Sequence, residues 1–171
     1  MTTKTRSGPS DTTAVVRRYQ QMVYALCLTH TPCRADADDA FQEVFLTFHR
    51  KQPACHGEEH RKAWLIRTSL TVARRVCASS WRTRVVLGAE EPDGAGAFRF
   101  DVEEYDVLFK ALSALPPDYR SAIHLFYFED LPVGQIAALL DLTPGAVKTR
   151  LSRGRAQLRS TMKEETHAQP R

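Results

Sequence analysis

The sequence LPVGQIAALLDLTPGAVKTRLSRGRAQLR, residues 131–159, predicts two short helices joined by a tight turn. Thr143 has the hydroxyl of a helix N-cap, and Pro144 suits the first helical position because its φ is already fixed. Apolar residues recur at spacings of three, four and seven, which gives each helix one face to bury. These residues are Ile136, Ala137 and Leu140 in the first helix and Val147, Leu151 and Leu158 in the second. The stretch therefore predicts a helix-turn-helix.

The other side of the second helix is basic. Residues 141–159 contain five Lys or Arg and one acid. Lys and Arg bind phosphates and also read guanine edges in the major groove, whereas a helix that is merely solvated needs no such excess of cations. We therefore predict that this helix binds duplex DNA, with Lys148, Thr149, Ser152 and Arg153 at base edges or in the groove and with Arg150 and Arg155 on phosphates.

The rest of the chain is predicted to be helical as well. Residues 13–82 show helical periodicity in three segments, the last at about 59–82, and Asp36 is a candidate cap for the middle one. Residues 83–103 hold three glycines, a proline and several acids, which predicts a flexible acidic linker. A second helical unit follows at 104–160, with a new helix at Pro117 and a polar tail from Ser160. The expected fold is all-α, with two small helical domains.

Composition narrows the class of protein. The chain has 171 residues and a net charge of +4, and residues 61–84 carry seven Lys or Arg without an acid. No apolar run approaches the roughly 20 residues that span a bilayer, and residues 1–13 lack the apolar core of a secretory signal. We expect a cytoplasmic protein that does not insert into a membrane. Its two basic segments, residues 61–84 and 141–159, are expected to bind a polyanion.

The cysteines and histidines allow a different chemistry. Cys27, His30 and Cys33 are three residues apart, with Cys55 and His56 further on, which leaves a redox or zinc sensor open. However, the spacing fits no closed zinc pattern, and Cys27 lies in an apolar helix as a small hydrophobic residue would. No phosphate-binding glycine loop and no carboxylate pair for two metals occurs. We therefore expect no metal, no cofactor and no enzyme activity.

Longer strings resemble a known family. LSALPPDYRSAIHLFYFEDLPVGQIAALLDLTPGAVKTRLSRGRAQLR resembles the promoter-binding C-terminal domain of extracytoplasmic-function (ECF) sigma factors. DADDAFQEVFLTFHR resembles their helix that docks on the clamp of RNA polymerase, and AWLIRTSLTVARRVCASSWRTR resembles their helix that opens and reads the −10 promoter bases. The resemblance implies a sigma factor that binds RNA polymerase core at the β′ clamp, promoter DNA at −10 and −35, and an anti-sigma factor. A stand-alone helix-turn-helix regulator is the alternative, but it leaves the N-terminal strings without a role.

The resemblance also assigns residues to the N-terminal domain. The core-binding candidates are Asp38, Asp39, Phe41, Gln42, Glu43 and Phe45, in which acids would pair with basic polymerase residues and aromatic rings would add apolar contact. The candidates for −10 binding and melting are Trp64, Arg67, Thr71, Arg74, Arg75, Trp81 and Arg82, where cations follow the backbone and aromatic faces stack on bases. Two of these depart from the family, which usually has Asn at Thr71 and Asp at Arg75. Trp64 is expected to be at least partly in the core.

Overall fold

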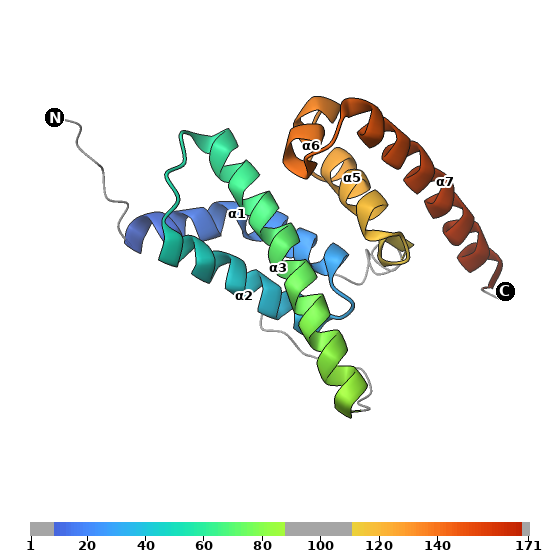
Figure 1. Cartoon of the computed structure of the whole chain (residues 1–171), viewed down its shortest axis with the longest axis horizontal. Helices are drawn as coiled ribbons and strands as arrows, with labels where there is room; N and C mark the ends of the chain where they lie inside the picture. The colour runs from blue at the N-terminus through green and yellow to red at the C-terminus, as the bar shows by residue number, and fades with distance from the viewer. Residues whose placement is uncertain (1–8, 88–110, 169–171) are drawn as a thin grey trace.

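The N-terminal half folds into a bundle of three helices. A computed structural model describes the backbone of residues 9–87 and 111–168 and the side chains of 12–79 and 111–163. Helices α1 (Pro9–His30), α2 (Arg34–Lys51) and α3 (Glu58–Leu87) each pack against the other two (Figure 1). The bundle closes on one hydrophobic cluster, because each helix contributes a stripe at helical spacing. Its buried residues are Val15, Tyr19, Val23, Cys27, Ala37, Ala40, Val44, Phe45, Phe48, Leu65 and Val72.

The start of α2 and the end of α3 differ from the prediction. Cys33 occupies the N-cap of α2 without a side-chain cap bond, and Asp36 is buried inside the first turn, so the predicted Asp36 cap is wrong. An acid in that turn is still favoured by the helix dipole. Helix α3 continues to Leu87, which corrects the predicted linker start at residue 83. The remainder of the predicted linker, residues 88–103, lies outside the described residues.

The C-terminal half contains the predicted helix-turn-helix. After a helix that ends at residue 113, the chain forms α5 (Pro117–Tyr127), α6 (Val133–Leu140) and α7 (Pro144–Ala168). Pro117 is at the start of α5 as predicted, and the backbone amide of Ala146 donates to the Thr143 hydroxyl at 3.2 Å, which confirms Thr143 as a cap. Helix α7 runs through Ser160 to Ala168, so the predicted polar tail is helical at its start.

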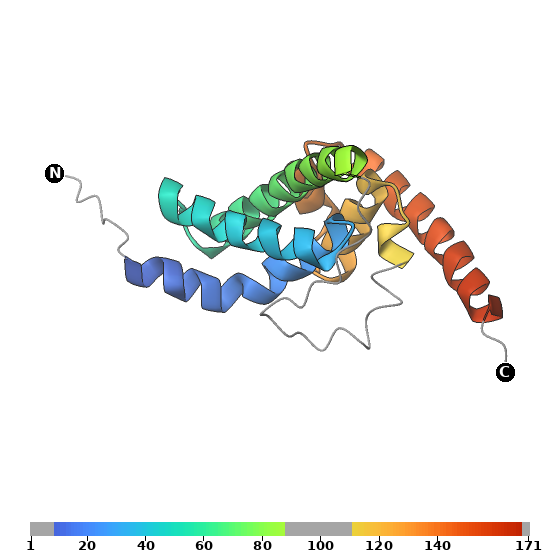
Figure 2. The same ribbon diagram turned by 90° about the horizontal axis from the view of Figure 1, so that it is seen from below.

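The two halves pack on each other. Leu26, Ile66 and Leu70 of the N-terminal bundle share one buried cluster with residues of the C-terminal half, among them Leu112 and Leu125. Helix α5 contacts α1, and α6 contacts α3, and Figures 1 and 2 show the C-terminal helices lying along one end of the bundle. The all-α prediction is confirmed, and residues 9–87 and 111–168 contain no strand. The close contact between the halves is a feature that the sequence did not predict.

Candidate nucleic-acid and polymerase interfaces

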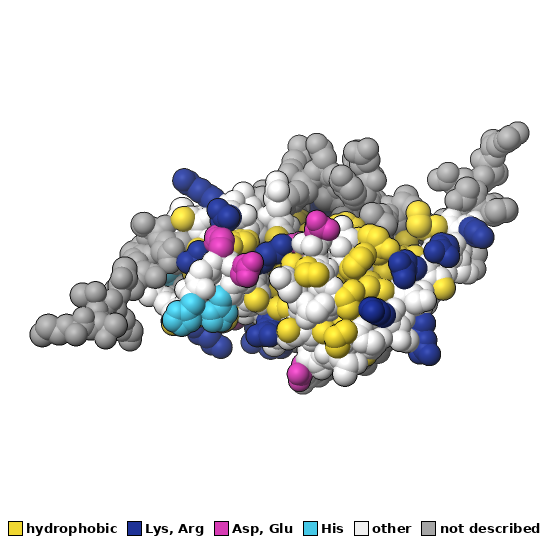
Figure 3. Space-filling view, turned by 90° about the horizontal axis from the view of Figure 1, so that it is seen from above, with side chains coloured by type: hydrophobic (Ala, Val, Ile, Leu, Met, Phe, Trp, Pro, Cys, Tyr) yellow, Lys and Arg dark blue, Asp and Glu magenta, His cyan; other side chains and the backbone are white. Residues whose placement is uncertain are grey.

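Helix α7 has one buried side and one cationic side. Val147 and Leu151 are buried against α5 and α6, as their spacing predicted. On the opposite side the exposed residues follow at spacings of three and four, so they share one face of the helix. Figure 3 shows blue Lys and Arg side chains over the part of the molecule where α7 lies. The exposed reading face consists of Lys148, Thr149, Ser152 and Arg153.

The other two DNA candidates of α7 lie beside this face. Arg150 points to α5, where its Nη2 is 3.2 Å from Asp118 Oδ2. Arg155 is exposed, and its Nη1 donates to the Tyr127 hydroxyl at 3.4 Å. The sequence already assigned these two to phosphates, and the structure adds that each of them contacts a neighbour in its own domain.

Gly154 is a positioning residue that the sequence analysis did not single out. It is buried in the middle of α7 where this helix crosses α5. A Cβ added there would lie 2.9 Å from Ile123 Cγ1, closer than carbon atoms normally approach, and 3.4 Å from Tyr119 Cβ, which is ordinary contact. A glycine within an otherwise strong helix sequence was the available signal, because glycine weakens helices unless close packing requires it.

Four of the −10 candidates share the outer face of α3. Arg67, Thr71, Arg74 and Arg75 are all exposed, and their spacings of four, three and one place them on one side of the helix. Arg67 is also held by the C-terminal half, since its Nη2 donates to the Ala138 carbonyl of α6 at 2.9 Å.

Of the two tryptophan candidates, Trp64 is the one whose side chain the structure describes. Trp64 packs edge to face on Phe48 at 5.5 Å between ring centroids, and it is partly buried against the bundle core, as expected for core or mixed use. The side chains of Trp81 and Arg82 lie outside the described residues, although their backbone belongs to α3.

Arg75, one of the two departures from the family, forms a cross-helix ion pair. Its Nη2 is 3.4 Å from Glu43 Oε1, and the same oxygen forms an ion pair with Arg50 Nη2 at 2.9 Å. Desolvation would raise the pKa of the Glu43 carboxyl, but the Thr47 hydroxyl and the two arginines outweigh it and lower that pKa below its usual value. Glu43 is therefore a carboxylate already surrounded by cations of its own chain.

Helix α2 divides the predicted core-binding residues into two groups. Phe45 is buried and Phe41 stacks edge to face on it and on Tyr24, so the rings hold α2 in the bundle instead of forming its outer surface. Asp38 accepts the Tyr24 hydroxyl at 2.9 Å, and burial together with Asp38 raises the pKa of Tyr24 to about 12.

The outer side of α2 exposes a different set. Asp39 and Gln42 are exposed as predicted, and Leu46 beside them is 53% exposed. Leu46 was not a predicted site residue. The other apolar residues of this helix are buried or half-buried, so Leu46 is the apolar side chain of α2 that a partner can cover.

The cysteine and histidine motif does not form a cluster of ligands. Burial raises the pKa of the Cys27 thiol to about 12, which leaves it an unreactive core residue. His30 turns toward α5, where its Nε2 is 3.0 Å from the Ser121 hydroxyl. Among the described residues, no three His, Cys, Asp or Glu are placed to hold a metal ion.

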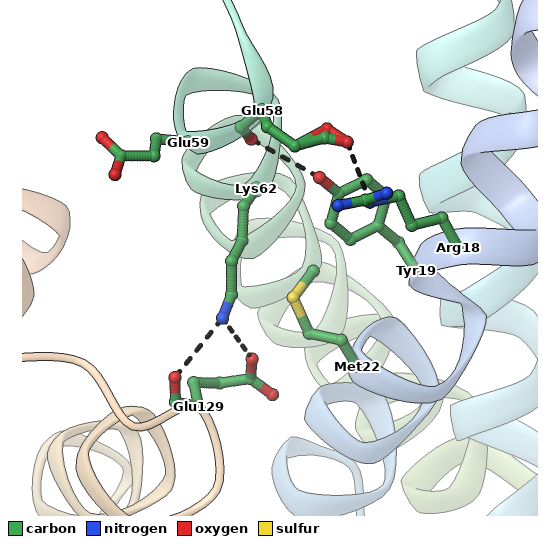
Figure 4. Close-up of a pocket in the computed structure, with 7 residues that line it drawn as sticks. All are labelled: Arg18, Tyr19, Met22, Glu58, Glu59, Lys62 and Glu129. Carbon is green, nitrogen blue, oxygen red and sulfur yellow. Dashed lines mark hydrogen bonds and ion pairs between the residues drawn. The ribbon is translucent and has the colours of Figure 1, made fainter.

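Polar contacts join the two halves next to the hydrophobic cluster. Lys62 Nζ is 3.1 Å from Glu129 Oε2 and donates to the Glu129 carbonyl at 3.3 Å, across a pocket that Figure 4 shows between α1, α3 and the C-terminal half. Arg120 Nη1 donates to the Thr29 carbonyl at 3.1 Å and its Nη2 donates to the Leu115 carbonyl at 2.8 Å. Neither Lys62 nor Arg120 was a predicted site residue, because each acts through a partner distant in sequence.

Two family models together match most of the chain. The model described as Sigma-70 region 2 matches residues 15–85, and the model described as Sigma-70, region 4 matches residues 105–158. None of the described helices is long and apolar enough to cross a membrane.

Known proteins agree with these matches. The ECF RNA polymerase sigma-E factor of Escherichia coli is 27% identical over 155 residues, which cover 82% of this chain and 81% of that protein. The probable RNA polymerase sigma factor RfaY of Xanthomonas campestris is 30% identical over 157 residues, 86% of this chain and 39% of that protein. Among solved structures, the sigma factor RpoE in complex with the anti-sigma factor NepR from Bartonella quintana has a TM-score of 0.64 at 22% identity, over 90% of this chain and 97% of that one. CnrH in complex with the cytosolic domain of CnrY has a TM-score of 0.67 at 20% identity, over 92% of this chain and 91% of that one.

The fold and the two matched regions define a sigma factor of the sigma-70 superfamily. Within that superfamily the chain belongs to the ECF group, whose members bind RNA polymerase core and direct transcription to specific promoters.

Proposed function

We propose that this sigma factor uses three separate surfaces for promoter-specific initiation. The reading surface is Lys148, Thr149, Ser152 and Arg153 on α7, and it contacts the −35 element as duplex. The melting surface is Arg67, Thr71, Arg74 and Arg75 on α3, and it contacts the −10 element. The docking surface is Asp39, Gln42 and Leu46 on α2, and it contacts the polymerase clamp. The single observation that carries the proposal is the exposed cationic face of α7 opposite a buried apolar one.

The reading surface has the chemistry of a major-groove helix. It lies in the first three turns of α7, next to the helix N-terminus that Thr143 caps. Lys148 and Arg153 can donate to guanine edges or phosphates, while the hydroxyls of Thr149 and Ser152 suit either role. Arg150 and Arg155 are held beside the groove by Asp118 and Tyr127, so we assign them secondary phosphate contacts.

The residues of the melting surface favour contacts with the DNA backbone over stacking on bases. Three arginines on one exposed face can follow the phosphates of a separated strand. Trp64 packs on Phe48, so its ring is committed to the bundle. Arg75 is held beside Glu43 and has a structural as well as a DNA-binding use.

The docking surface combines charge with one apolar residue. Asp39 is the predicted acid that remains both exposed and outside the Tyr24 and arginine contacts that engage Asp38 and Glu43. Acids at the rim steer a basic partner, and an exposed Leu46 supplies the apolar centre that such interfaces need.

Use of both DNA surfaces at once requires the two halves to separate. Elements at −10 and −35 lie about 25 base pairs apart, which is about 85 Å of duplex at about 3.4 Å per base pair. In the structure Arg67 donates to α6, and α6 packs directly on α7. Since a helix with its side chains is about 10–12 Å across, the two surfaces lie within roughly 30 Å. The structure is therefore a closed form, and promoter binding requires an open one.

The remaining assignments follow from the family. The polymerase core performs the nucleotidyl transfer, and this chain supplies specificity without a catalytic site of its own, in the cytoplasm where the polymerase works. The similar Bartonella sigma factor was determined in complex with the anti-sigma factor NepR. We propose that a protein of that kind also binds this chain.

The test is run-off transcription with purified polymerase core on a library of promoter fragments. We expect specific starts with the wild-type protein and their loss with Asp39→Lys. Glu59→Lys is the matched control, because Glu59 is also an exposed acid and lies outside the docking surface. If the free protein instead binds duplex tightly while it neither binds core nor yields starts, the stand-alone regulator is the correct function.

A further inference from the structure

Two buried histidines lie where the two halves of the closed form meet. His30, at the end of α1, has its Nε2 3.0 Å from the Ser121 hydroxyl of α5. His124 of α5 has its Nδ1 2.9 Å from the Thr29 hydroxyl of α1. The two rings lie edge to face at 6.0 Å, and the exposed fractions of the residues are 7% and 0%. We call these four residues the histidine seam, in which each half supplies one histidine and one hydroxyl.

Hydrogen-bond donors fix the protonation of His124. The Thr29 hydroxyl donates to the Ala25 carbonyl at 2.7 Å, so its oxygen accepts from the imidazole Nδ1–H. Nε2 then carries the lone pair of a neutral ring. This atom is buried without a hydrogen-bond partner, and the ring stacks on Phe128 at 4.9 Å. A proton added at Nε2 would place a charge in a largely apolar site, which is costly.

His30 is neutral in the seam for a different reason. Its Nδ1 donates to the Leu26 carbonyl at 2.9 Å, and its Nε2 faces the Ser121 hydroxyl, which also lies 2.9 Å from the Pro117 carbonyl. A neutral Nε2 accepts the hydroxyl proton, so burial and the neighbouring cations, and not the hydrogen bonds, oppose the charged form. Burial lowers the pKa of His30 to about 4, and the cations Arg120 and Arg74 add to this effect against the Leu26 bond. Burial, with His30 nearby, lowers the pKa of His124 to about 3.

The other titratable groups around the seam come from α3 and the end of α5. The Cys77 thiol of α3 donates to the His30 carbonyl at 3.1 Å. Glu129 Oε1 is 3.9 Å from His124 Nε2 and would favour a proton there, but Lys62 of α3 holds that carboxylate at 3.1 Å. Among the described residues, the charges that face His30 are cationic, and the acid that faces His124 is already paired.

We propose that the histidine seam is a proton-sensitive lock, which holds the two halves closed when both imidazoles are neutral and releases them when the imidazoles are protonated. The lock concerns the closed form itself. Its consequence, that release separates the reading surface from the melting surface, rests on the proposed function.

The direction of the pH effect follows from proton counts. In the open form both histidines reach water and titrate near the ordinary pKa of about 6.5, so below that pH the open form binds more protons than the closed form. Acid therefore favours opening, and between pH 7.5 and 5.5 the ratio of open to closed molecules should rise about tenfold for each histidine and about 100-fold for both. Glu129 acts in the opposite sense. Burial raises its pKa in the closed form against the effect of Lys62, but this favours closure only in the more acidic range where carboxyl groups titrate.

Small-angle X-ray scattering of the full chain tests the lock. The radius of gyration of the wild type should increase from pH 7.5 to 5.5, while far-UV circular dichroism shows that its helices persist. The variant H30Q/H124Q cannot be protonated at the seam, and its radius should not change over the same range. The matched control is H56Q/H60Q, because His56 and His60 are exposed near the start of α3, and it should expand as the wild type does.

Two outcomes overturn the proposal: a wild-type radius that stays constant to pH 5.5, or an equal expansion of H30Q/H124Q. Should that variant lose its helices, histidine proton NMR of the wild type decides. Protonation of His30 and His124 that accompanies the expansion supports the lock, and expansion while both remain neutral refutes it. None of these measurements uses polymerase or DNA. A failure of the lock can therefore be distinguished from a failure of the proposed function in run-off transcription.

Discussion

Substitution of Gly154 tests how closely α7 must approach α5. In Gly154→Ala the new methyl carbon would lie 2.9 Å from Ile123 Cγ1 and 3.3 Å from its Cδ1, where carbon atoms prefer about 3.5–4.0 Å. Overpacking of this kind costs about 1–3 kcal/mol. The better helix propensity of alanine offsets up to about 1 kcal/mol of this loss in the free energy of unfolding. The net change should be a loss of about 0–2 kcal/mol in the free energy of unfolding.

Gly145→Ala is the matched control in the same helix. A Cβ at Gly145 meets only the Thr143 hydroxyl oxygen at 4.0 Å, so no atom has to move. This variant should gain a few tenths of a kcal/mol, up to about 1, from helix propensity alone. Urea unfolding of the full chain compares the two variants, and run-off transcription shows whether displacement of α7 also weakens promoter use.

A double variant identifies the clash as the cause. Ile123→Ala removes both atoms that the new methyl group would approach too closely and should itself cost about 2–5 kcal/mol. Gly154→Ala should be less harmful, or favourable, in that background, with a coupling energy of about 0.5–3 kcal/mol. If Gly154→Ala is as stable as Gly145→Ala, or if the two substitutions simply add, the argument from close packing is incorrect.

Three further predictions concern the surfaces and the bundle. Arg153→Ala should reduce the salt slope of promoter binding by about one if Arg153 contacts a phosphate, or cost about 1–3 kcal/mol of binding at one base pair if it reads a base edge. Arg150→Ala should change either quantity less, because Asp118 holds Arg150. Equal effects of the two substitutions in a salt titration would contradict the assignment. Arg75→Asp should bring a carboxylate against Glu43 and lower the thermal midpoint slightly, since exposed pairs contribute about 0–1 kcal/mol, whereas Arg75→Gln should lower it less. Trp64→Ala should destabilise the bundle by somewhat less than the about 3–5 kcal/mol of a fully buried tryptophan, and unchanged stability with lost promoter opening would make Trp64 a DNA contact instead.

Local patterns were enough to predict the helices and the turn of the C-terminal half. The Thr143 cap, the start at Pro117 and the buried Val147 and Leu151 are set by spacing and by residues a few positions away, and all of them were confirmed. The error at Asp36 is also local, because several acids near a helix start are all plausible caps and only the backbone path selects one. Helix ends such as Leu87 depend on packing and on marginal propensity, which is why they were misplaced.

Site residues were harder to predict because exposure depends on the whole bundle. Phe45 and Leu46 are neighbours with similar hydrophobicity, yet one is buried and the other forms part of the outer surface of α2. Arg150 and Arg153 are both cations of one helix, and the ion pair that holds Arg150 in place comes from Asp118 on α5. In each case the deciding atom belongs to another element.

The sequence by itself determined the class of fold and the family, because helix periodicity, caps and motif strings are properties of neighbouring residues. Tertiary structure alone decided the closed contact between the halves. His30 meets Ser121, and Thr29 meets His124, across 91 and 95 residues of chain. No periodicity connects such distant positions, since their contact arises only when apolar faces on α1, α3 and α5 are buried together and bring the polar side chains between them.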